Sequence, residues 1–137
     1  MGFALEDAKA AMGTAFPEVV QDLKIVIESV TKDGVQLRLP LDPRRCREGD
    51  IVSGQALSML ADTSMVYCIW AAIGARNPVG TVDLHVTFLR PAAKSDVLAR
   101  AEVVRLGRTL AFARVTLLAA ASLIPVATAI GTFALPP

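Results

Sequence analysis

The stretch from Ser53 to Ala75 constrains the fold of this 137-residue chain more than any other segment. It contains no proline, its only charged side chain is that of Asp62, and its apolar residues recur at intervals of three and four. That spacing predicts one long helix over residues 54–75, apolar on nearly every side and therefore buried. Ser53 is well placed to cap the start of this helix, and residues 74–78, with glycine and proline, end it.

Asp62 is the feature of this helix that needs a physical explanation. Burying an ionised carboxylate costs several kcal/mol unless the group is paired, hydrogen-bonded or used in chemistry. The helix alone leaves two interpretations open. In the first, backbone or hydroxyl donors hold the carboxylate, with Thr63 and Ser64 close in sequence. In the second, the carboxylate acts on a bound molecule.

The remaining segments predict a short leading helix, a β-hairpin, a loop and four further strands. Residues 3–15 have helical spacing and end at Phe16-Pro17, where proline disfavours a further turn. Residues 40–50 are polar and contain prolines and a glycine, which predicts a loop. Strands are expected at 23–31 and 35–39, around a Lys-Asp-Gly turn, and at 80–89, 97–106, 110–118 and 124–134.

The order of these elements predicts a single α+β domain over residues 1–137. Short connections between the last four strands favour an antiparallel meander, and the economical packing is one sheet curled around the long helix. Hydrophobic residues make up 53% of the chain and charged residues only 20%. This is more apolar surface than a monomer of this size easily hides, so we expect a second subunit to cover part of it.

Charge and cysteine content exclude several classes of function. The formal net charge of +1 creates no field that would attract nucleic acid or anionic lipid. Asp62 and Pro125 interrupt the longest apolar stretches, so no membrane span is expected. Cys46 and Cys68 lack the spacing of a metal site, which predicts a reducing compartment and no zinc. No secretory signal is visible at the N-terminus, so the expected location is the cytoplasm.

Four segments of the chain form a pattern in a fixed order. They are Ser53-Gly-Gln followed by Leu60-Ala-Asp62, the strand and turn 81–92 (TVDLHVTFLRPA), the turn 106–111 (LGRTLA) and the final strand 127–133 (ATAIGTF). With these spacings, the chain from about Arg47 to Phe133 resembles the hotdog-fold acyl-CoA thioesterases, in the branch of the phenylacetate-pathway and 4-hydroxybenzoyl-CoA enzymes. The resemblance implies a hotdog fold, in which an antiparallel sheet wraps around one long central helix.

The resemblance also implies roles for three residues in hydrolysing an aryl or medium-chain acyl-CoA to a free acid and CoA. Asp62 stands where the family has a general base for the attacking water, or a nucleophile for the thioester carbonyl. The backbone N–H of Gly54, at the start of the helix, would polarise the thioester oxygen, helped by the helix dipole. Thr81 stands where a hydroxyl residue orients the water or the carboxylate.

Three positions depart from the family pattern. Ser53 replaces the family's histidine, Gln55 replaces its second glycine, and Arg47 stands where some members carry an asparagine. Ser53 is either a hydroxyl donor at the site or simply the cap of the helix. Gln55 offers an amide that would orient the thioester. These departures leave the pair of Asp62 and Gly54 intact but bear on whether the protein is an active enzyme.

The phosphates of coenzyme A require cations near the mouth of the site. The resemblance places two turn arginines, Arg90 and Arg108, against CoA, and Arg47 is a further candidate contact. Other candidate cations are Arg44, Arg45 and Arg76. The acyl group is expected along the apolar face of the helix, near Leu57, Met59, Met65 and Val66. No metal is expected, and no cofactor apart from the CoA of the substrate itself.

Three functions follow from these observations. The first is an acyl-CoA thioesterase working as a homodimer or a dimer of dimers, with each site built from two subunits. The second is an acyl-CoA or acyl-carrier binding protein without chemistry, which the replacements at Ser53 and Gln55 allow. The third is a hotdog dehydratase or hydratase, which needs a histidine. His85 is the only histidine, and its position on a strand between Asp83 and Thr87 favours a structural role.

Overall fold

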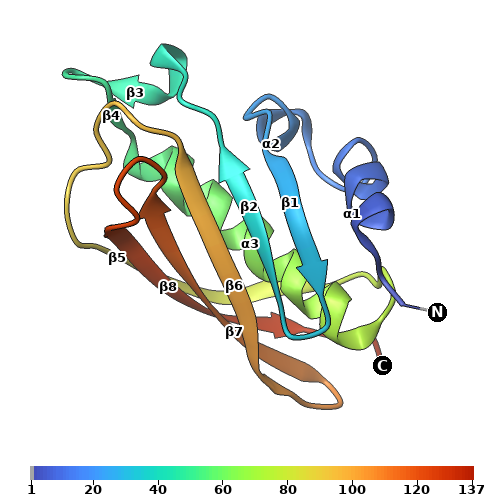
Figure 1. Ribbon diagram of the computed structural model, residues 1–137. Helices are drawn as coiled ribbons and strands as arrows, with labels where there is room; N and C mark the ends of the chain where they lie inside the picture. Colours follow the sequence, from blue (N-terminus) through green and yellow to red (C-terminus); the bar gives the residue numbers. More distant parts are fainter. Residues whose placement is uncertain (1) are drawn as a thin grey trace.

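The computed structural model describes residues 2–137 and has one antiparallel sheet curled around one long helix (Figure 1). The six strands lie in the order β1-β2-β6-β7-β8-β5, and a separate two-stranded ribbon joins β3 to β4. This confirms the predicted α+β hotdog architecture with a central helix. The elements are α1 (Leu5–Met12), α2 (Glu18–Gln21), β1 (Val26–Thr31), β2 (Gly34–Leu39), the 3-10 turn η1 (Pro43–Arg45), β3 (Cys46–Arg47), β4 (Ile51–Val52), α3 (Gly54–Ile73), β5 (Gly80–Phe88), β6 (Val97–Leu106), β7 (Leu110–Ala119) and β8 (Pro125–Ala134).

The central helix α3 begins and ends as its sequence predicts. The Ser53 side chain accepts a hydrogen bond from the backbone N–H of Ala56 at 3.1 Å, which satisfies one of the free donors of the first turn. Gly74 ends the helix in the left-handed conformation, with φ of 87°, and its N–H bonds to the carbonyl of Trp70 at 2.8 Å. The helix therefore spans almost the whole predicted range.

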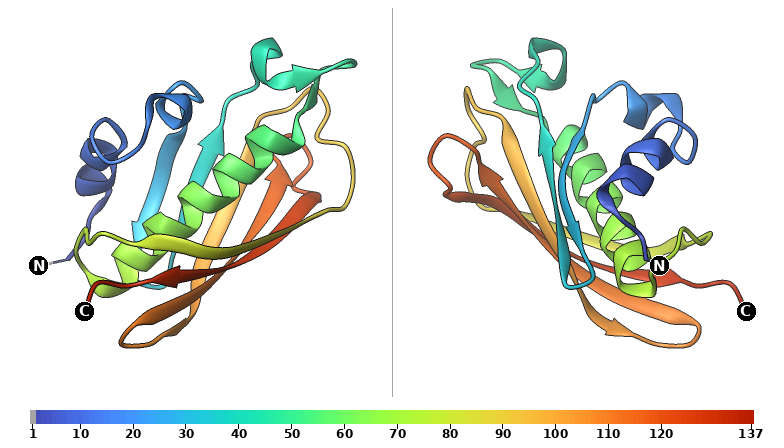
Figure 2. Two further views of the ribbon diagram at one scale, coloured as in Figure 1. Left: turned by 180° about the vertical axis from the view of Figure 1, so that it is seen from behind. Right: turned by 45° about the vertical axis from the view of Figure 1, so that its right-hand side comes forward.

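The predicted four-strand meander is wrong in one connection. Strands β6, β7 and β8 do follow one another in the sheet, but β5 pairs with β8 at the far edge, where His85 lies opposite Ile130. The other neighbour of β6 is β2, with Leu37 opposite Ala99. The segment 89–96, which joins β5 to β6, is long enough to cross the end of the sheet. The connection between these two strands therefore does not make them neighbours. Figure 2 shows β5 and β8 side by side at this edge.

The N-terminal part also differs from the prediction in its boundaries. The helix expected over residues 3–15 is confined to α1, because Gly13 takes the capping position. Pro17 then starts a second short helix, α2, which the pattern had not indicated, and β1 begins three residues later than expected. The predicted loop 40–50 contains η1 and β3. Two-residue strands are too short to leave a periodic signal in the sequence.

The sheet covers one side of α3 and leaves the other side partly open. Leu60, Met65 and Ile69 are fully buried towards the core, whereas Asp62 is only half-buried. Met65 of α3 packs against β8 at Gly131, where a Cβ atom would lie only 2.8 Å from Cε1 of Phe133 and 3.1 Å from Cε of Met65. A glycine is therefore required where the sheet meets the helix.

The helix α3 is long and apolar enough to cross a membrane by length and composition alone. However, 67% of its most apolar window is buried inside the domain. This burial is typical of the core helix of a globular domain.

Candidate active site

Asp62 lies on the half-open side of α3 and faces strand β5. Its Oδ1 accepts a hydrogen bond from the hydroxyl of Thr81 at 3.0 Å. No cation forms an ion pair with Asp62 among residues 2–137, and Thr63 and Ser64 do not hold it, since the Ser64 hydroxyl donates to the Leu60 carbonyl instead. The structure thus brings Asp62 and Thr81 together and leaves the carboxylate with free acceptor positions.

The surroundings of Asp62 make its carboxylate more basic than an exposed one. Burial raises the pKa of Asp62 above its ordinary value, because the charged form loses hydration. The hydrogen bond from Thr81 acts in the opposite direction and lowers the pKa of Asp62 by stabilising the carboxylate. A carboxylate with a raised pKa is a better proton acceptor, which suits a general base.

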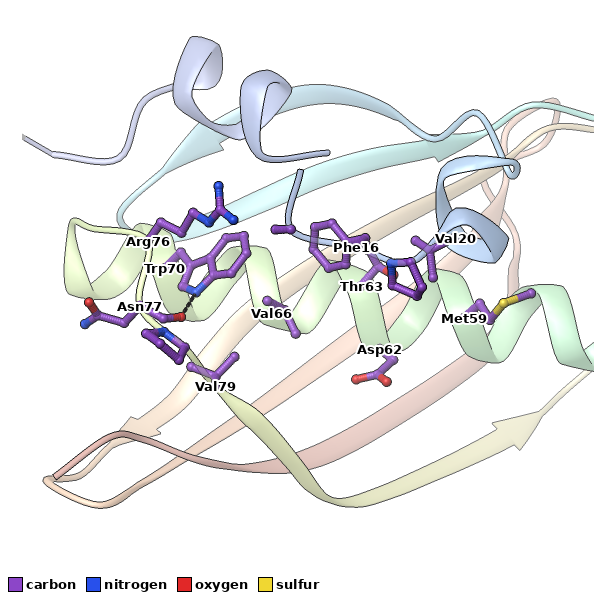
Figure 3. A pocket seen from close by; sticks show the side chains of 13 residues that line it. Phe16, Val20, Met59, Asp62, Thr63, Val66, Trp70, Arg76, Asn77 and Val79 are labelled. Carbon is purple, nitrogen blue, oxygen red and sulfur yellow. Dashed lines mark hydrogen bonds between the residues drawn. The ribbon is translucent and has the colours of Figure 1, made fainter. Parts of the chain in front are cut away.

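An apolar pocket of about 490 Å³ opens beside Asp62 (Figure 3). One wall is α3, and the others are the segment around α2 and the segment that precedes β5. This volume lies in the range of small-molecule sites in proteins. Its walls are mostly apolar, and Asp62 is the only acidic group among them. They include Phe16, Val20, Met59, Val66, Trp70 and Val79. A half-buried carboxylate at the side of an apolar pocket is able to act on an apolar substrate.

Gly54 lies in a separate hollow of about 260 Å³ at the start of α3. Arg47 and Arg90 line the same hollow, as do Leu57 and Phe88. The first N–H groups of a helix have no partner inside the helix, so the N–H of Gly54 is available to an oxygen atom there. The approach is close, because a Cβ atom at Gly54 would lie 3.3 Å from Cζ of Phe88. The structure therefore groups Gly54 with two of the arginines predicted to contact CoA.

Gly54 and Asp62 do not meet within one chain. They are eight residues apart on α3, which corresponds to about 12 Å along the helix axis. They also line different hollows. A single thioester carbonyl can therefore reach both groups only if they come from two different chains.

The two replaced positions beside Gly54 have different surroundings. The Ser53 Oγ accepts the capping bond from the Ala56 N–H and keeps its own O–H as a donor, whereas the Gln55 side chain is exposed. The structure shows the capping role of Ser53, and its role as a hydroxyl donor at the site stays a prediction. Gln55 remains free to meet a ligand.

Removing the cap has a measurable consequence for stability. We expect Ser53→Ala to lower the free energy of unfolding by about 1 kcal/mol, because the N–H of Ala56 loses its acceptor. Ser58→Ala makes the same chemical change inside α3 and should be neutral or slightly stabilising, since alanine is the better helix former. Urea unfolding of both variants measures the difference. Equal stabilities would contradict the capping role.

Two other predicted residues, Met65 and Arg108, lie away from these hollows. Met65 is fully buried against Gly131 in the core and lines neither hollow. The reason is helical phase, which turns Met65 towards the sheet and Met59 and Val66 towards the pocket. Arg108, in the turn between β6 and β7, also lines neither of them. Its contact with CoA stays a prediction.

His85 and the cysteines are not part of the pocket beside Asp62. His85 is exposed on β5 and lies opposite Ile130. Burial raises the pKa of the Cys68 thiol to about 12, so this cysteine is neutral. Among residues 2–137, no group of three or more histidine, cysteine or acidic side chains is arranged to hold a metal ion.

Sequence reasoning missed most of the pocket wall. Phe16 was assigned only to the end of the first predicted helix, and Asn77 and Pro78 only to the stop of the long one, whereas Arg76 was already a candidate cation. Phe16 and Trp70 belong to a cluster of aromatic rings, in which their centroids lie 5.8 Å apart. The only available signal was the concentration of aromatic residues near the two helix ends, which does not reveal a cavity.

Residues 49–122, more than half of the chain, match the thioesterase superfamily. The chain belongs to this family. A protein of Halobacterium salinarum named for an inferred esterase activity is 31% identical over 124 residues, covering 84% of this chain and 80% of that protein. Membership of the thioesterase superfamily, together with such relatives, makes the protein a hydrolase of the thioesterase type. The matched range includes Gly54, Asp62 and Thr81.

Solved structures of other members show the same fold. A protein from Silicibacter sp. TM1040, described as an inferred thioesterase, superposes with a TM-score of 0.87 at 29% identity, covering 98% of this chain and 93% of its own. Zebrafish thioesterase superfamily member 2 superposes with a TM-score of 0.83 at 24% identity, covering 97% of this chain and 99% of its own. This thioesterase-family chain therefore has the fold of the family along its whole described length.

Proposed function

We propose that this protein hydrolyses acyl-CoA thioesters, with Asp62 as general base. The observation that carries the proposal is a half-buried carboxylate with no cationic partner among residues 2–137, held by Thr81 and placed beside an apolar pocket. The pocket would hold an aryl or medium-chain acyl group against Met59 and Val66. CoA would extend towards the arginines at the mouth of the site.

The proposed reaction uses the two groups in complementary ways. Asp62 accepts a proton from a water molecule, and the resulting hydroxide attacks the carbonyl carbon of the thioester. The negative charge that develops on the carbonyl oxygen is stabilised by the N–H of the partner subunit's Gly54 and the dipole of its helix. The carbon–sulfur bond then breaks, and the CoA sulfur leaves as a thiolate that takes up a proton. The alternative, in which Asp62 itself attacks the carbonyl, uses the same geometry.

The proposal requires a homodimer, and the edge strand β5 supports one. Its nine residues pair only with β8, so the other edge of the strand has unpaired backbone groups. Val82 and Phe88 on this strand are 61% and 52% exposed. An open, apolar strand edge next to Thr81 is suited to pairing with a second copy of the chain. We further propose that two such dimers associate to a dimer of dimers. Sedimentation equilibrium tests both states.

The first experiment is a thiol-release assay across aryl, short-chain and long-chain acyl-CoAs. We expect release of CoA from at least one class and a preference for acyl groups that fit the apolar pocket. Absence of thiol release from all classes would overturn the proposed hydrolysis of acyl-CoA.

Thr81 offers a test through the pH dependence of hydrolysis. Hydrolysis needs the charged form of Asp62, so kcat/KM should fall as pH decreases through its raised pKa. Thr81→Val removes the hydrogen bond that lowers this pKa, so the fall should move to higher pH, with kcat/KM reduced about tenfold. Thr81→Ser retains the hydroxyl and should keep the wild-type profile. An unchanged profile in Thr81→Val would show that Thr81 does not act on Asp62.

A second candidate function is acyl-CoA or acyl-carrier binding without hydrolysis. The observation that favours it is the replacement of the family's histidine by Ser53, whose oxygen accepts the capping bond at the start of α3. Tight binding of acyl-CoA without release of thiol would support this function. A dehydratase is disfavoured because His85 is exposed on β5 and does not line the pocket.

A further inference from the structure

The pocket beside Asp62 has a single basic residue in its wall, Arg76. Asp62 is the only acidic residue of the same wall. In Figure 3, Val66 and Trp70 lie between the two charged side chains. The pocket therefore has a carboxylate in one part, a guanidinium in another, and apolar surface between them.

Arg76 has no acidic partner of its own among residues 2–137. Arg38, Arg44 and Arg114 each form an ion pair with a carboxylate, but Arg76 does not. Its Nη1 donates to the hydroxyl of Thr14 at 3.0 Å, and its Cζ lies 6.0 Å from the centroid of the Trp70 ring. A guanidinium has five N–H donors, so most of them remain free for an anion.

The surroundings hold Arg76 and Trp70 in place. The indole Nε1 of Trp70 donates to the backbone carbonyl of Asn77 at 2.6 Å, which fixes the ring on which the guanidinium rests. The bond to Thr14 fixes the other side of the guanidinium. Arg76 is exposed, and these two contacts restrict its side chain, which reduces the entropy lost when an anion binds.

The separation of Asp62 from Trp70, whose ring lies beside the Arg76 guanidinium, indicates the length of a matching ligand. Asp62 and Trp70 are eight residues apart on α3, or about 12 Å along the axis. An extended chain advances about 1.2 Å per bond, so roughly ten bonds span this distance. An acyl chain of about eight carbons with a terminal carboxylate, together with the reach of the arginine side chain, covers it.

We propose that the pocket selects acyl groups whose far end carries a carboxylate, and that Arg76 binds this carboxylate. The inference rests on the proposed function, because it assumes that the acyl group of a CoA thioester lies in this pocket. The substrate class is then the mono-CoA thioester of a medium-chain dicarboxylic acid. Arg76 is the specificity-determining residue.

The test compares octanedioyl-CoA with octanoyl-CoA, which have the same chain length and differ only at the far end. Calorimetry with the Asp62→Asn variant measures binding without turnover. We expect octanedioyl-CoA to bind about fivefold more tightly, and Arg76→Gln in the same background to remove this preference. Arg105→Gln removes an exposed arginine of β6 that does not line the pocket, and it should keep the preference.

The outcomes separate this inference from the proposed function. Equal affinities for the two thioesters, a preference that survives Arg76→Gln, or no binding of either ligand would overturn the role of Arg76. Thiol release from octanoyl-CoA by the wild-type protein would still support hydrolysis in those cases. Preferential binding of octanedioyl-CoA without any thiol release would keep the role of Arg76 and overturn hydrolysis. If Asp62→Asn does not fold, the ratio of kcat/KM for the two thioesters replaces the ratio of affinities. This ratio is then measured in the wild type and in Arg76→Gln.

Discussion

Asp62→Asn is expected to reduce thioester hydrolysis about a thousandfold, with a small change in KM. The amide has nearly the same shape as the carboxylate and keeps an acceptor for the Thr81 hydroxyl, but it cannot take a proton from water. The expected loss lies within the usual contribution of a general base, about a hundredfold to ten-thousandfold. Steady-state thiol release at a pH above the raised pKa of Asp62 measures it.

Stability serves as the control for this variant. Because burial raises the pKa of Asp62 in the folded state, the free energy of unfolding falls as pH rises from the ordinary pKa of aspartate to the raised one. The neutral amide avoids this loss, so the Tm of Asp62→Asn at neutral pH should equal or exceed that of the wild type. Asp33→Asn, in the exposed turn between β1 and β2, makes the same change elsewhere and should keep full activity. Hydrolysis by Asp62→Asn at close to the wild-type rate would show that Asp62 is not the base.

Gly131→Ala is expected to lower the free energy of unfolding by about 2 kcal/mol. The new Cβ would lie 2.8 Å from Cε1 of Phe133 and 3.1 Å from Cε of Met65, and both side chains are fully buried. Overpacking of this kind forces side chains or backbone to move in a close-packed core. Urea unfolding monitored by circular dichroism measures the loss.

Gly80→Ala is the matched control for this substitution. Gly80 also lies in a strand of the same sheet, but a Cβ atom there would have no neighbour within 4 Å. Its expected effect is close to zero. If both variants lost the same stability, the cause would be the removal of glycine from a strand and not contact with the helix.

The sequence predicted the central helix well because every local signal there agreed. Ser53 supplied the cap, Gly74 supplied the left-handed end, and the apolar spacing between them excluded a strand. The β-hairpin and the last four strands were predicted for the same reason, since each run is bounded by turn residues.

The position of β5 was not predictable from those local signals. Strand neighbours depend on which edges are free after the sheet assembles, and β2 already occupies the edge of β6 that β5 was expected to take. The pairing of Leu37 with Ala99 buries both residues, which no pattern within β5 reveals. Non-local pairing of this kind is a property of the whole sheet.

For the candidate site, sequence alone determined that Asp62 is a charge on an apolar helix and that Gly54 begins this helix, because both statements depend only on the order of residues. The tertiary structure decided what surrounds them. It placed the Thr81 hydroxyl on Asp62, turned Met65 into the core, and brought Phe16 and Arg76 into one pocket wall. These contacts join residues far apart in the chain, and they exist only once the sheet has closed around the helix.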